Sequence, residues 1–472
     1  MRHFHLISVV ALLALAACDL GPDYTRPALE VPAAFRASAA GAAQAWPAPG
    51  WWHGFGSPEL DRLIAEAQAY NQDLAAAAAR VVQADAQVSI AGSPLLPNVS
   101  ASASGSYTRT GSRQAFGPNG SHYIDSRQYG VQGNVGYEVD FWGKNRAFYQ
   151  SARAAALASR FDQQTVALTV VTSVATTYFQ ALGAADRLEV AQRNLTDARQ
   201  TLQVFRVRVE VGTATALDIA QQEALVAGEA AQIPAFRSQY EQQVIALGIL
   251  VGRPPEDIHI TANTLATLPT PLVGGGLPSE LLARRPDVAN AEATLVSQNG
   301  NVRAARAAFF PSIQLTAAGG IESLAFSTLL GPGSLLVSAA ASATQTVFDN
   351  GLEQGTLDQA KGRYAELVAD YRKAVLQAFD DADTALVAVH YAADQEVLEA
   401  HAAAVAQRAA DIARAQLAAG TVDITIVLNT ETTLFADQDA LAQVRLLHFQ
   451  ALVTLYEALG GGWKQSDAAG TT

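Results

Sequence analysis

The chain carries one pattern of prolines and glycines twice. In each half a proline ends an amphipathic segment, and the glycines that follow are separated by 69 residues and then by 40 residues. The landmarks are Pro97, Gly143, Gly212 and Gly252 in the first half, and Pro311, Gly351, Gly420 and Gly460 in the second. A spacing that recurs over such a length indicates two copies of one structural unit, so the chain is expected to fold as an internal repeat.

The two copies divide the chain into regions. We expect repeat 1 over residues 57–254 and repeat 2 over 279–462, each with helices, two strands and a long helical hairpin whose tip lies at residue 212 or 420. Residues 255–278 are rich in proline and glycine and are expected to form a linker in an equatorial belt outside the helices. Residues 463–472 remain as a C-terminal tail.

The beginning of the chain has the features of an export signal. Residues 1–17 combine a weakly positive start with an apolar core of twelve residues, which is too short to span a bilayer but typical of a signal peptide. The segment ends in Leu15-Ala16-Ala17-Cys18, which resembles the lipobox of bacterial lipoproteins, so Cys18 is the predicted lipidation site. The alternative is a buried cysteine that merely follows the signal peptide. Residues 18–56 would then form a lipidated N-terminal tether.

Four segments alternate small polar residues with apolar ones. They cover residues about 98–109, 127–140, 311–321 and 334–348. This period of two is typical of strands with one face in lipid and one in water, although a soluble sheet with one wet face gives the same pattern. The lipoprotein signal favours a barrel. Because a membrane barrel needs about eight strands or more, several copies of the chain must build it: two would supply about eight strands, and three about twelve.

The segments between the strands and the tips keep a heptad spacing of apolar residues, which predicts coiled-coil packing of neighbouring helices. One such series is Leu188, Leu195, Leu202 and Val209. A helix of 69 residues spans about 100 Å, far more than one globular domain needs.

Two glycines are expected to end the long helices as left-handed caps, Gly212 and Gly420. Thr215, with Asp218 three residues later, is a variant of the capping box that opens the returning helix. Asp423 has two interpretations. It caps the last helix and favours its positive end, or it lines the mouth of an oligomeric tube with a ring of carboxylates.

Composition argues against several functions. The formal net charge is −13 and the sequence has no basic patch, so a nucleic-acid partner is not expected. The sequence has no P-loop, its histidines are not spaced as metal ligands, and its single Met and single Cys leave no soft metal site. We therefore expect no enzyme activity, no cofactor and no metal.

Motifs along nearly the whole chain resemble one family. They are Leu20-Gly21-Pro22-Asp23-Tyr24 with Arg26-Pro27, Tyr137-Glu138-Val139-Asp140-Phe141-Trp142-Gly143, the run from Leu277 to Asp287 followed by Ala291-Glu292, Ala307-Ala308-Phe309-Phe310-Pro311-Ser312-Ile313, and Ala458-Leu459-Gly460-Gly461-Gly462-Trp463. Together they are similar to the motifs of TolC-type outer-membrane efflux channels, specifically the lipoprotein branch called the NodT family, which are outer-membrane factors of RND efflux.

The resemblance implies a mixed α and β membrane protein. Long helical hairpins of a homotrimer would form an α-barrel, continued by a β-barrel of twelve strands, four per chain. The implied location is the outer membrane of a Gram-negative bacterium, with a lipid anchor and a part that extends into the periplasm. The implied partners are outer-membrane lipid, a periplasmic adaptor (membrane fusion) protein and an inner-membrane RND transporter.

The resemblance also maps functional residues. The adaptor-docking tips correspond to Gly212-Thr213 and Gly420-Thr421, and the aperture region runs from Asp423 through Glu431. Many relatives carry an aspartate after Val-Leu in this last helix, whereas here Asn429 follows. The periplasmic gate candidates are therefore Asp423, which is charged, and Asn429, which is not.

These features lead to one expected function: the exit duct of a tripartite efflux system that exports small molecules or drugs by passive conduction, with a gate at the periplasmic tips. The first alternative is the exit duct of a type I protein-secretion system, which has the same architecture. A trimeric surface adhesin and a small-molecule porin are less favoured. The strands lie inside each repeat and make up only a small part of the chain.

Overall fold

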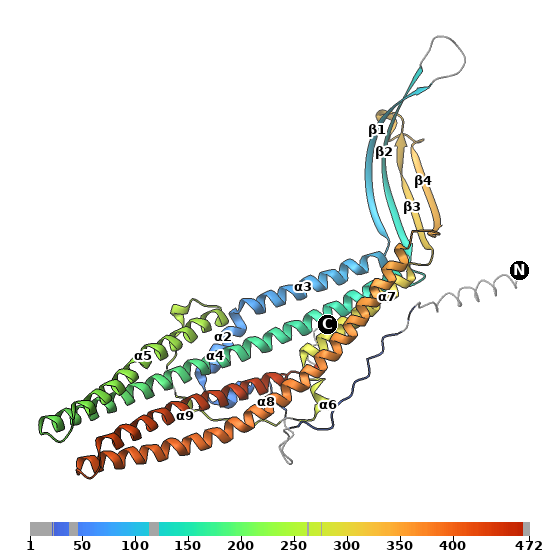
Figure 1. Cartoon of the computed structure of the whole chain (residues 1–472). Coiled ribbons are helices and arrows are strands. Elements are labelled where there is room, and N and C mark those ends of the chain that lie inside the picture. Colours follow the sequence, from blue (N-terminus) through green and yellow to red (C-terminus); the bar gives the residue numbers. More distant parts are fainter. Residues whose placement is uncertain are drawn as a thin grey trace. The chain divides into compact units, whose positions relative to one another are not determined.

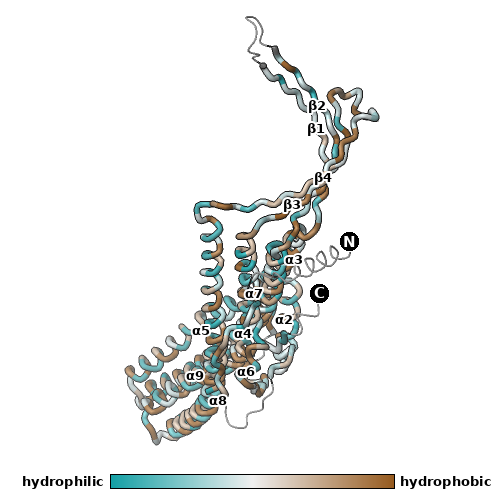
Figure 2. Tube along the Cα trace, turned by 90° about the vertical axis from the view of Figure 1, so that its right-hand side faces the viewer, coloured by the Kyte–Doolittle hydropathy of each residue, from teal (hydrophilic) through white to brown (hydrophobic). Residues whose placement is uncertain are grey.

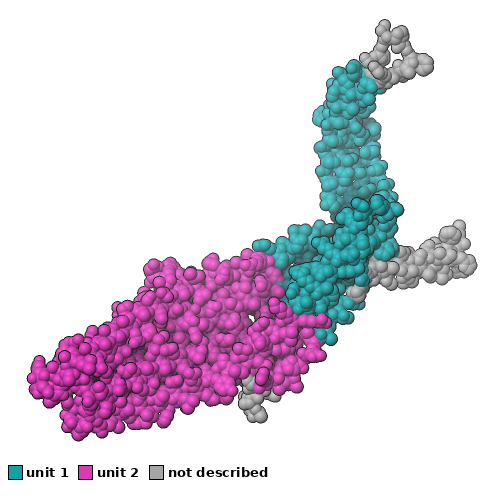
Figure 3. Space-filling view, in the orientation of Figure 1, with its two compact units in different colours: residues 1–28, 82–158, 291–370 teal, residues 29–81, 159–290, 371–472 magenta. Residues whose placement is uncertain are grey.

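The computed structural model describes residues 21, 23–36, 46–112, 122–261, 264–274 and 276–465. The predicted signal peptide, Cys18 and most of the predicted C-terminal tail lie outside these residues. The chain forms two compact units (Figure 3). Unit 1 comprises Met1–Ala28, Val82–Ala158 and Ala291–Asp370, and unit 2 comprises Leu29–Val81, Ser159–Asn290 and Tyr371–Thr472.

Unit 1 contains one antiparallel sheet of four strands in the order β1-β2-β3-β4 (Figure 1). The strands are β1 (Asn98–Ser112), β2 (His122–Val139), β3 (Ser312–Ser323) and β4 (Leu335–Thr344). Each repeat contributes one hairpin, and β2 pairs with β3 to join the two hairpins into a single sheet.

The register gives this sheet one apolar and one polar face. Val99, Val135, Ala317 and Ala339 lie opposite one another across the four strands. One residue further along, Ser100, Asn134, Ala318 and Ser338 form the next row on the other face. Figure 2 shows this alternation of hydrophobic and hydrophilic residues along the strands. The sheet therefore offers a face for lipid and a face for water.

The first hairpin is longer than the sequence pattern predicted. We expected strands over about 98–109 and 127–140, but β1 continues to Ser112 and β2 begins at His122. Arg109, at the end of the predicted first strand, forms a cross-strand ion pair with Asp125, which lies before the predicted second strand. In contrast, β4 ends at Thr344, before the predicted residue 348, because its partner Ser312 is the first residue of β3.

Aromatic residues gather where the strands meet the helices of unit 1. The ring of Trp142 stacks on Phe310 with a centroid distance of 4.8 Å, and its Nε1 donates to the carbonyl of Pro311 at 2.8 Å. Asp140 accepts hydrogen bonds from the backbone amides of Asn145 and Arg146 at 2.9 and 2.8 Å, which caps the helix that follows β2.

The helices carry most of the chain. Their bounds are α2 (Pro58–Tyr70), α3 (Gln72–Gly92), α4 (Lys144–Glu210), α5 (Ala216–Val251), α6 (Pro278–Leu281), α7 (Pro286–Ala307), α8 (Leu352–Ala418) and α9 (Ile424–Ala458). Short 3-10 helices are η1 (Trp51–Phe55), η2 (Ser93–Leu95), η3 (Pro255–Asp257), η4 (Leu265–Thr267) and η5 (Phe326–Thr328). The long helices α4 and α8 have 67 residues each, and the returning helices α5 and α9 have 36 and 35. The two repeats are thus built alike.

A hydrophobic core in unit 2 joins η1, α2, α4, α5 and α9. Trp51 stacks on Tyr456 with a centroid distance of 4.4 Å, and Phe55 lies between Phe179 and Phe449. We expected residues 18–56 to form an extended tether. Its end is instead folded, because burial of Trp51 and Phe55 removes large apolar side chains from water.

Helix α4 contains a window that is long and apolar enough to cross a membrane. However, 56% of that window is buried inside the structure, as expected for a core helix. Within the same core, Tyr178 of α4 shares a hydrogen bond of 2.9 Å with Ser57. Burial raises the pKa of Tyr178 to about 12, so its hydroxyl keeps its proton.

Two irregular segments are held by acidic side chains. In unit 1, Glu292 of α7 accepts hydrogen bonds from Tyr24 at 3.3 Å and from Arg26 Nε at 2.7 Å, which fixes the described N-terminal residues. In unit 2, Asp186 of α4 accepts from the backbone amide of Leu265 at 3.0 Å within the segment between α5 and α6.

Candidate gating site at the hairpin tips

Both helical hairpins turn with the same backbone geometry. Gly212 and Gly420 have φ of 75° and 72°, in the left-handed region that favours glycine. Thr213 N donates to the carbonyl of Arg208 at 2.8 Å, and Thr421 N donates to that of Gln416 at 2.9 Å. These are Schellman caps, and in each the threonine hydroxyl adds a hydrogen bond of 3.1 Å to the same carbonyl.

The returning helices also have equivalent N-caps, three residues after each glycine. Thr215 and Asp218 form a reciprocal capping box at the start of α5. At the start of α9, Asp423 Oδ1 accepts a hydrogen bond from the amide of Thr425 at 3.2 Å. Asp423 thus has the capping role that was one of its two interpretations.

The predicted site residues are at the surface of the single chain. Gly212, Thr213, Gly420 and Thr421 are exposed at the two tips, and so are Asp423 and Asn429. Among the described residues, Asp423 and Asn429 share no hydrogen bond, and the carbonyl of Asn429 accepts from Thr433 Oγ1 at 3.0 Å.

Behind the tips, a small apolar layer joins the two hairpins. This tip layer consists of Phe205, Ala413, Leu417, Ile424 and Val427, with Ile219 packed against it. It draws on α4, α5, α8 and α9, so the two hairpins are one four-helix bundle at this level. Figure 1 shows the ends of the two hairpins side by side.

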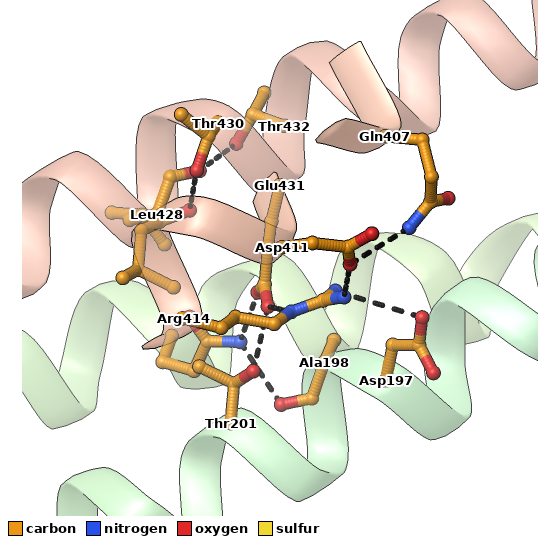
Figure 4. Close-up of polar contacts among 12 residues, drawn as sticks. Asp197, Ala198, Thr201, Gln407, Asp411, Arg414, Leu428, Thr430, Glu431 and Thr432 are labelled. Atoms are coloured by element: carbon orange, nitrogen blue, oxygen red, sulfur yellow. Dashed lines mark hydrogen bonds and ion pairs between the residues drawn. The ribbon is translucent and has the colours of Figure 1, made fainter. Parts of the chain in front are cut away.

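A polar layer follows the tip layer (Figure 4). At its centre the side chain of Glu431 from α9 is fully buried. Its Oε1 accepts hydrogen bonds from Thr201 Oγ1 of α4 at 2.6 Å and from Arg414 Nε of α8 at 2.9 Å. Gln222 Nε2 of α5 lies 3.4 Å from Oε2 of Glu431. One carboxylate therefore contacts all three neighbouring helices.

Arg414 connects this layer to further acidic groups. It lies 3.5 Å from Asp197 of α4 and 3.5 Å from Asp411 of its own helix. Its side chain keeps 29% of its surface exposed. The charge of Glu431 is thus paired with a cation that is itself partly hydrated.

A second apolar layer lies on the other side of the polar one. It consists of Ala198, Ala406, Ala410, Leu434 and Phe435, with Leu225 and Val226 packed against it. A buried carboxylate between two apolar layers is costly unless it is hydrogen-bonded and paired. The three contacts of Glu431 with the neighbouring helices meet this requirement in the structure.

The sequence reasoning did not identify this polar layer. Glu431 was placed only at the end of the aperture region. The available signal was its position, because Val427, Glu431 and Leu434 stand at core spacing on α9 and an acidic residue is unexpected there. Its partners lie 17 to 230 residues away, so sequence alone does not show them.

A further acidic residue, Glu229 of α5, is also buried. Gln232 Nε2 donates to its Oε1 at 3.3 Å. Burial raises the pKa of Glu229, and the nearby charge of Asp439 acts in the same direction, whereas hydrogen bonds from Asn194 and Gln232 lower it.

Chemically, the polar layer holds helices together and carries no reactive group aimed at a substrate. Within the described ranges, no group of three or more His, Cys, Asp or Glu side chains is placed to hold a metal ion. The arrangement suits a conformational role, because this one set of hydrogen bonds, between two apolar layers, fixes how α9 is aligned with the other three helices.

Comparisons with known proteins cover the whole architecture. A model of the outer membrane efflux protein family matches residues 63–253 and 277–461. The chain is 38% identical over 475 residues to the pyoverdine export outer membrane protein OpmQ of Pseudomonas aeruginosa, covering 100% of this chain and 98% of that protein. It is 30% identical over 466 residues to the cation efflux system protein CusC of Escherichia coli, covering 98% and 99%. The solved structure of the outer-membrane channel OprN superposes with a TM-score of 0.89 at 26% identity, covering 94% of this chain and 100% of that one.

Proposed function

Because the chain belongs to the outer membrane efflux protein family, we propose that it works with two further proteins as the outer-membrane exit duct of a tripartite pump. The chain itself is an outer-membrane efflux channel with the TolC-type fold. In this fold the long hairpins of three chains form an α-barrel, and four strands from each chain form the β-barrel that continues it. The family is one of channels and transport proteins.

The two partners of the duct are a periplasmic adaptor protein and an inner-membrane RND transporter. The adaptor docks at Gly212-Thr213 and Gly420-Thr421. The repeated geometry supports this assignment, because both tips present the same exposed Gly-Thr turn and a single type of adaptor surface fits either one. Cys18 carries the lipid that tethers the chain to the outer membrane, and a Cys18→Ser variant is expected to lose palmitate incorporation.

The polar layer around Glu431 supports a gate at the tips more than any other feature. A duct is regulated by shape, and the buried hydrogen bonds of Glu431 give the four-helix bundle one preferred closed arrangement from which an open one departs. Opening moves the tip helices outward. Asp423 and Asn429 line the aperture of the closed trimer, with Asp423 as its carboxylate.

Substitutions at Asp423 separate its two roles. Asp423→Ser keeps a side-chain oxygen that caps α9 but removes the charge, whereas Asp423→Ala removes both. If a carboxylate ring restricts the pore, both variants raise the resting conductance of the purified trimer in a planar bilayer. If Asp423 only caps the helix, Asp423→Ala alone changes conductance, and the ring assignment is rejected. Asn429→Asp tests the same aperture in the opposite direction, because it adds a carboxylate and should lower anion conductance.

The exported compounds are small molecules, and the relative named for pyoverdine export makes a siderophore-type compound one to test. Deletion of the gene is expected to sensitise the cell to a broad panel of toxic compounds or to trap a siderophore inside it. Complementation with the wild-type chain should reverse the effect. Loss of a secreted protein without any change in compound sensitivity would instead favour a type I secretion duct.

A further inference from the structure

In the first hairpin, β1 and β2 extend beyond the part of the sheet where β2 pairs with β3, and the face that carries Val99 continues into this extension. Pairing of β2 with β3 stops at Tyr129, whereas β1 and β2 remain paired as far as Ser112 and His122. In this extension Tyr107 lies opposite Arg127, Arg109 opposite Asp125, and Gly111 opposite Tyr123. Because side chains alternate along a strand, these residues share the face of Val99 and Val131, which is the face turned to lipid.

The height of the extension follows from strand geometry. Tyr129, whose ring contacts Phe326 edge-on at 5.8 Å, lies ten residues from Val139, the last residue of β2. Ten residues rise about 33 Å along a strand, or about 25 Å at the usual barrel tilt of about 40°. That height equals the apolar band of an outer-membrane barrel, about 25 Å. Val139 leads into the periplasmic helices, so Tyr129 marks the outer edge of the hydrocarbon.

The next residues on the lipid-facing side therefore lie in the outer headgroup zone. Arg127 and Asp125 follow Tyr129 at two-residue steps, about 5 and 10 Å higher by the same arithmetic. The headgroup region adds roughly 5–8 Å on each side of a bilayer core. Arg127 thus falls within this zone, and Arg109, opposite Asp125, lies just above it.

The arginines of this extension are held in place by tyrosines. The Arg127 guanidinium lies 5.8 Å from the ring centre of Tyr107, and that of Arg109 lies 5.6 Å from the ring centre of Tyr123. Arg109 also forms a two-point ion pair with Asp125 at 2.6 and 2.9 Å. Within the described part of the chain, Arg127 forms no ion pair, so the cluster of these five residues keeps a net positive charge.

Stacking on a tyrosine leaves the N–H donors of a guanidinium available at its edge, and a phosphate binds to this edge through two hydrogen bonds. The side chains are open for such contact, with exposed fractions of 54% for Tyr107, 64% for Tyr123 and 55% for Arg109. Strand pairing with a neighbouring chain uses the free edge of β1 and leaves this face uncovered.

We propose that this Arg-Tyr cluster binds a phosphate group of lipopolysaccharide, the phosphorylated glycolipid of the outer leaflet. Arg127 is the principal ligand because no carboxylate of the described residues forms an ion pair with it, whereas Asp125 is paired with Arg109. Arg109 contributes donors that its ion pair with Asp125 leaves free. The site belongs to the outer surface of the barrel and plays no part in conduction.

Binding to delipidated full-length trimer, titrated with purified lipopolysaccharide, tests the site. Arg127→Gln is expected to weaken binding about tenfold, as the loss of one charge-assisted pair does. Arg109→Gln combined with Asp125→Asn removes the ion pair without changing the net charge and should weaken binding to a smaller extent. The matched control is Arg363→Gln with Glu366→Gln, which removes an exposed ion pair of α8 in the same unit and should leave binding unchanged.

Two further ligands identify the chemistry. Lipopolysaccharide stripped of its phosphates should bind at least about tenfold more weakly to the wild-type trimer. Inorganic phosphate should fail to displace the intact glycolipid. Equal affinity of Arg127→Gln and wild type would overturn the proposal, and so would equal affinity for the stripped ligand. Full displacement by inorganic phosphate would assign the cluster to free anions and reject the glycolipid.

Discussion

Replacing Glu431 with alanine is expected to loosen the four-helix bundle at the hairpin tips by about 3 kcal/mol. The variant loses the hydrogen bonds that Glu431 accepts from Thr201 at 2.6 Å and from Arg414 at 2.9 Å. Breaking a buried pair costs about 3–5 kcal/mol when the remaining charge is left without a partner. Arg414 retains 29% exposure and still faces Asp197 and Asp411 at 3.5 Å, so the lower end of that range applies.

The effect should be local and can be measured by hydrogen exchange of the purified trimer. A loss of about 3 kcal/mol shifts the local opening equilibrium about 140-fold, and amides at the start of α9 should exchange faster by that factor. Glu431→Gln keeps the shape and an acceptor oxygen and should cost about 1 kcal/mol.

The matched control is Glu223→Ala in α5. Glu223 pairs with Arg206 at 3.0 Å, but both side chains are about half exposed, so its loss should cost less than about 1 kcal/mol. If Glu431→Ala and Glu223→Ala give the same exchange at the start of α9, the polar layer does not hold the bundle closed, and the argument for a gate at this level fails.

Four further variants probe other parts of the chain. Burial raises the pKa of Glu229 above its ordinary 4.5, so the folded protein loses stability as pH rises past that value and the carboxyl group must ionise. Glu229→Gln should therefore raise the melting temperature at pH 7. The gain should vanish when melting is repeated below pH 4.5. Gly420→Ala should lower the free energy of unfolding by about 1–2 kcal/mol through backbone strain alone, because no atom lies within 4 Å of an added Cβ. Gly460→Ala should abolish the yield of folded trimer, since its Cβ would lie 1.9 Å from the carbonyl oxygen of Arg284. Glu292→Gln should speed chymotryptic cleavage after Tyr24, whose hydroxyl donates to Glu292, and an unchanged digestion rate would show that the N-terminal segment is held by other contacts.

The architecture was predictable from sequence because it depends on spacing. The repeated glycines, the period of two in the strands and the heptads in the helices are local patterns, and the predicted TolC-type fold and efflux function are confirmed by the family match and by OprN. The turns were predictable for the same reason, since Gly212 and Gly420 occur in the conformation that favours glycine. The roles of Asp423, Asn429 and the docking tips stay predictions.

Long-range polar contacts were not predictable. The hydrogen bond from Thr201 to Glu431 joins residues 230 positions apart, and a heptad pattern records only that a site is buried. The length of the first hairpin was misjudged for a related reason. Asp125 resembles a loop residue when read singly, and its pairing with Arg109 across the hairpin is visible only in the structure.

A single carboxylate between two apolar layers restricts how the helices can move. A displacement of α9 along its own axis by one turn, about 5.4 Å, would leave the Glu431 charge among alanines and leucines without a donor, at a cost of several kcal/mol. A tilt of α9 about this point keeps the carboxylate of Glu431 near its donors and avoids that free-energy cost. If the tips open as we propose, the bore is expected to widen by a tilt of α9 about the level of Glu431, with the length of the tube unchanged.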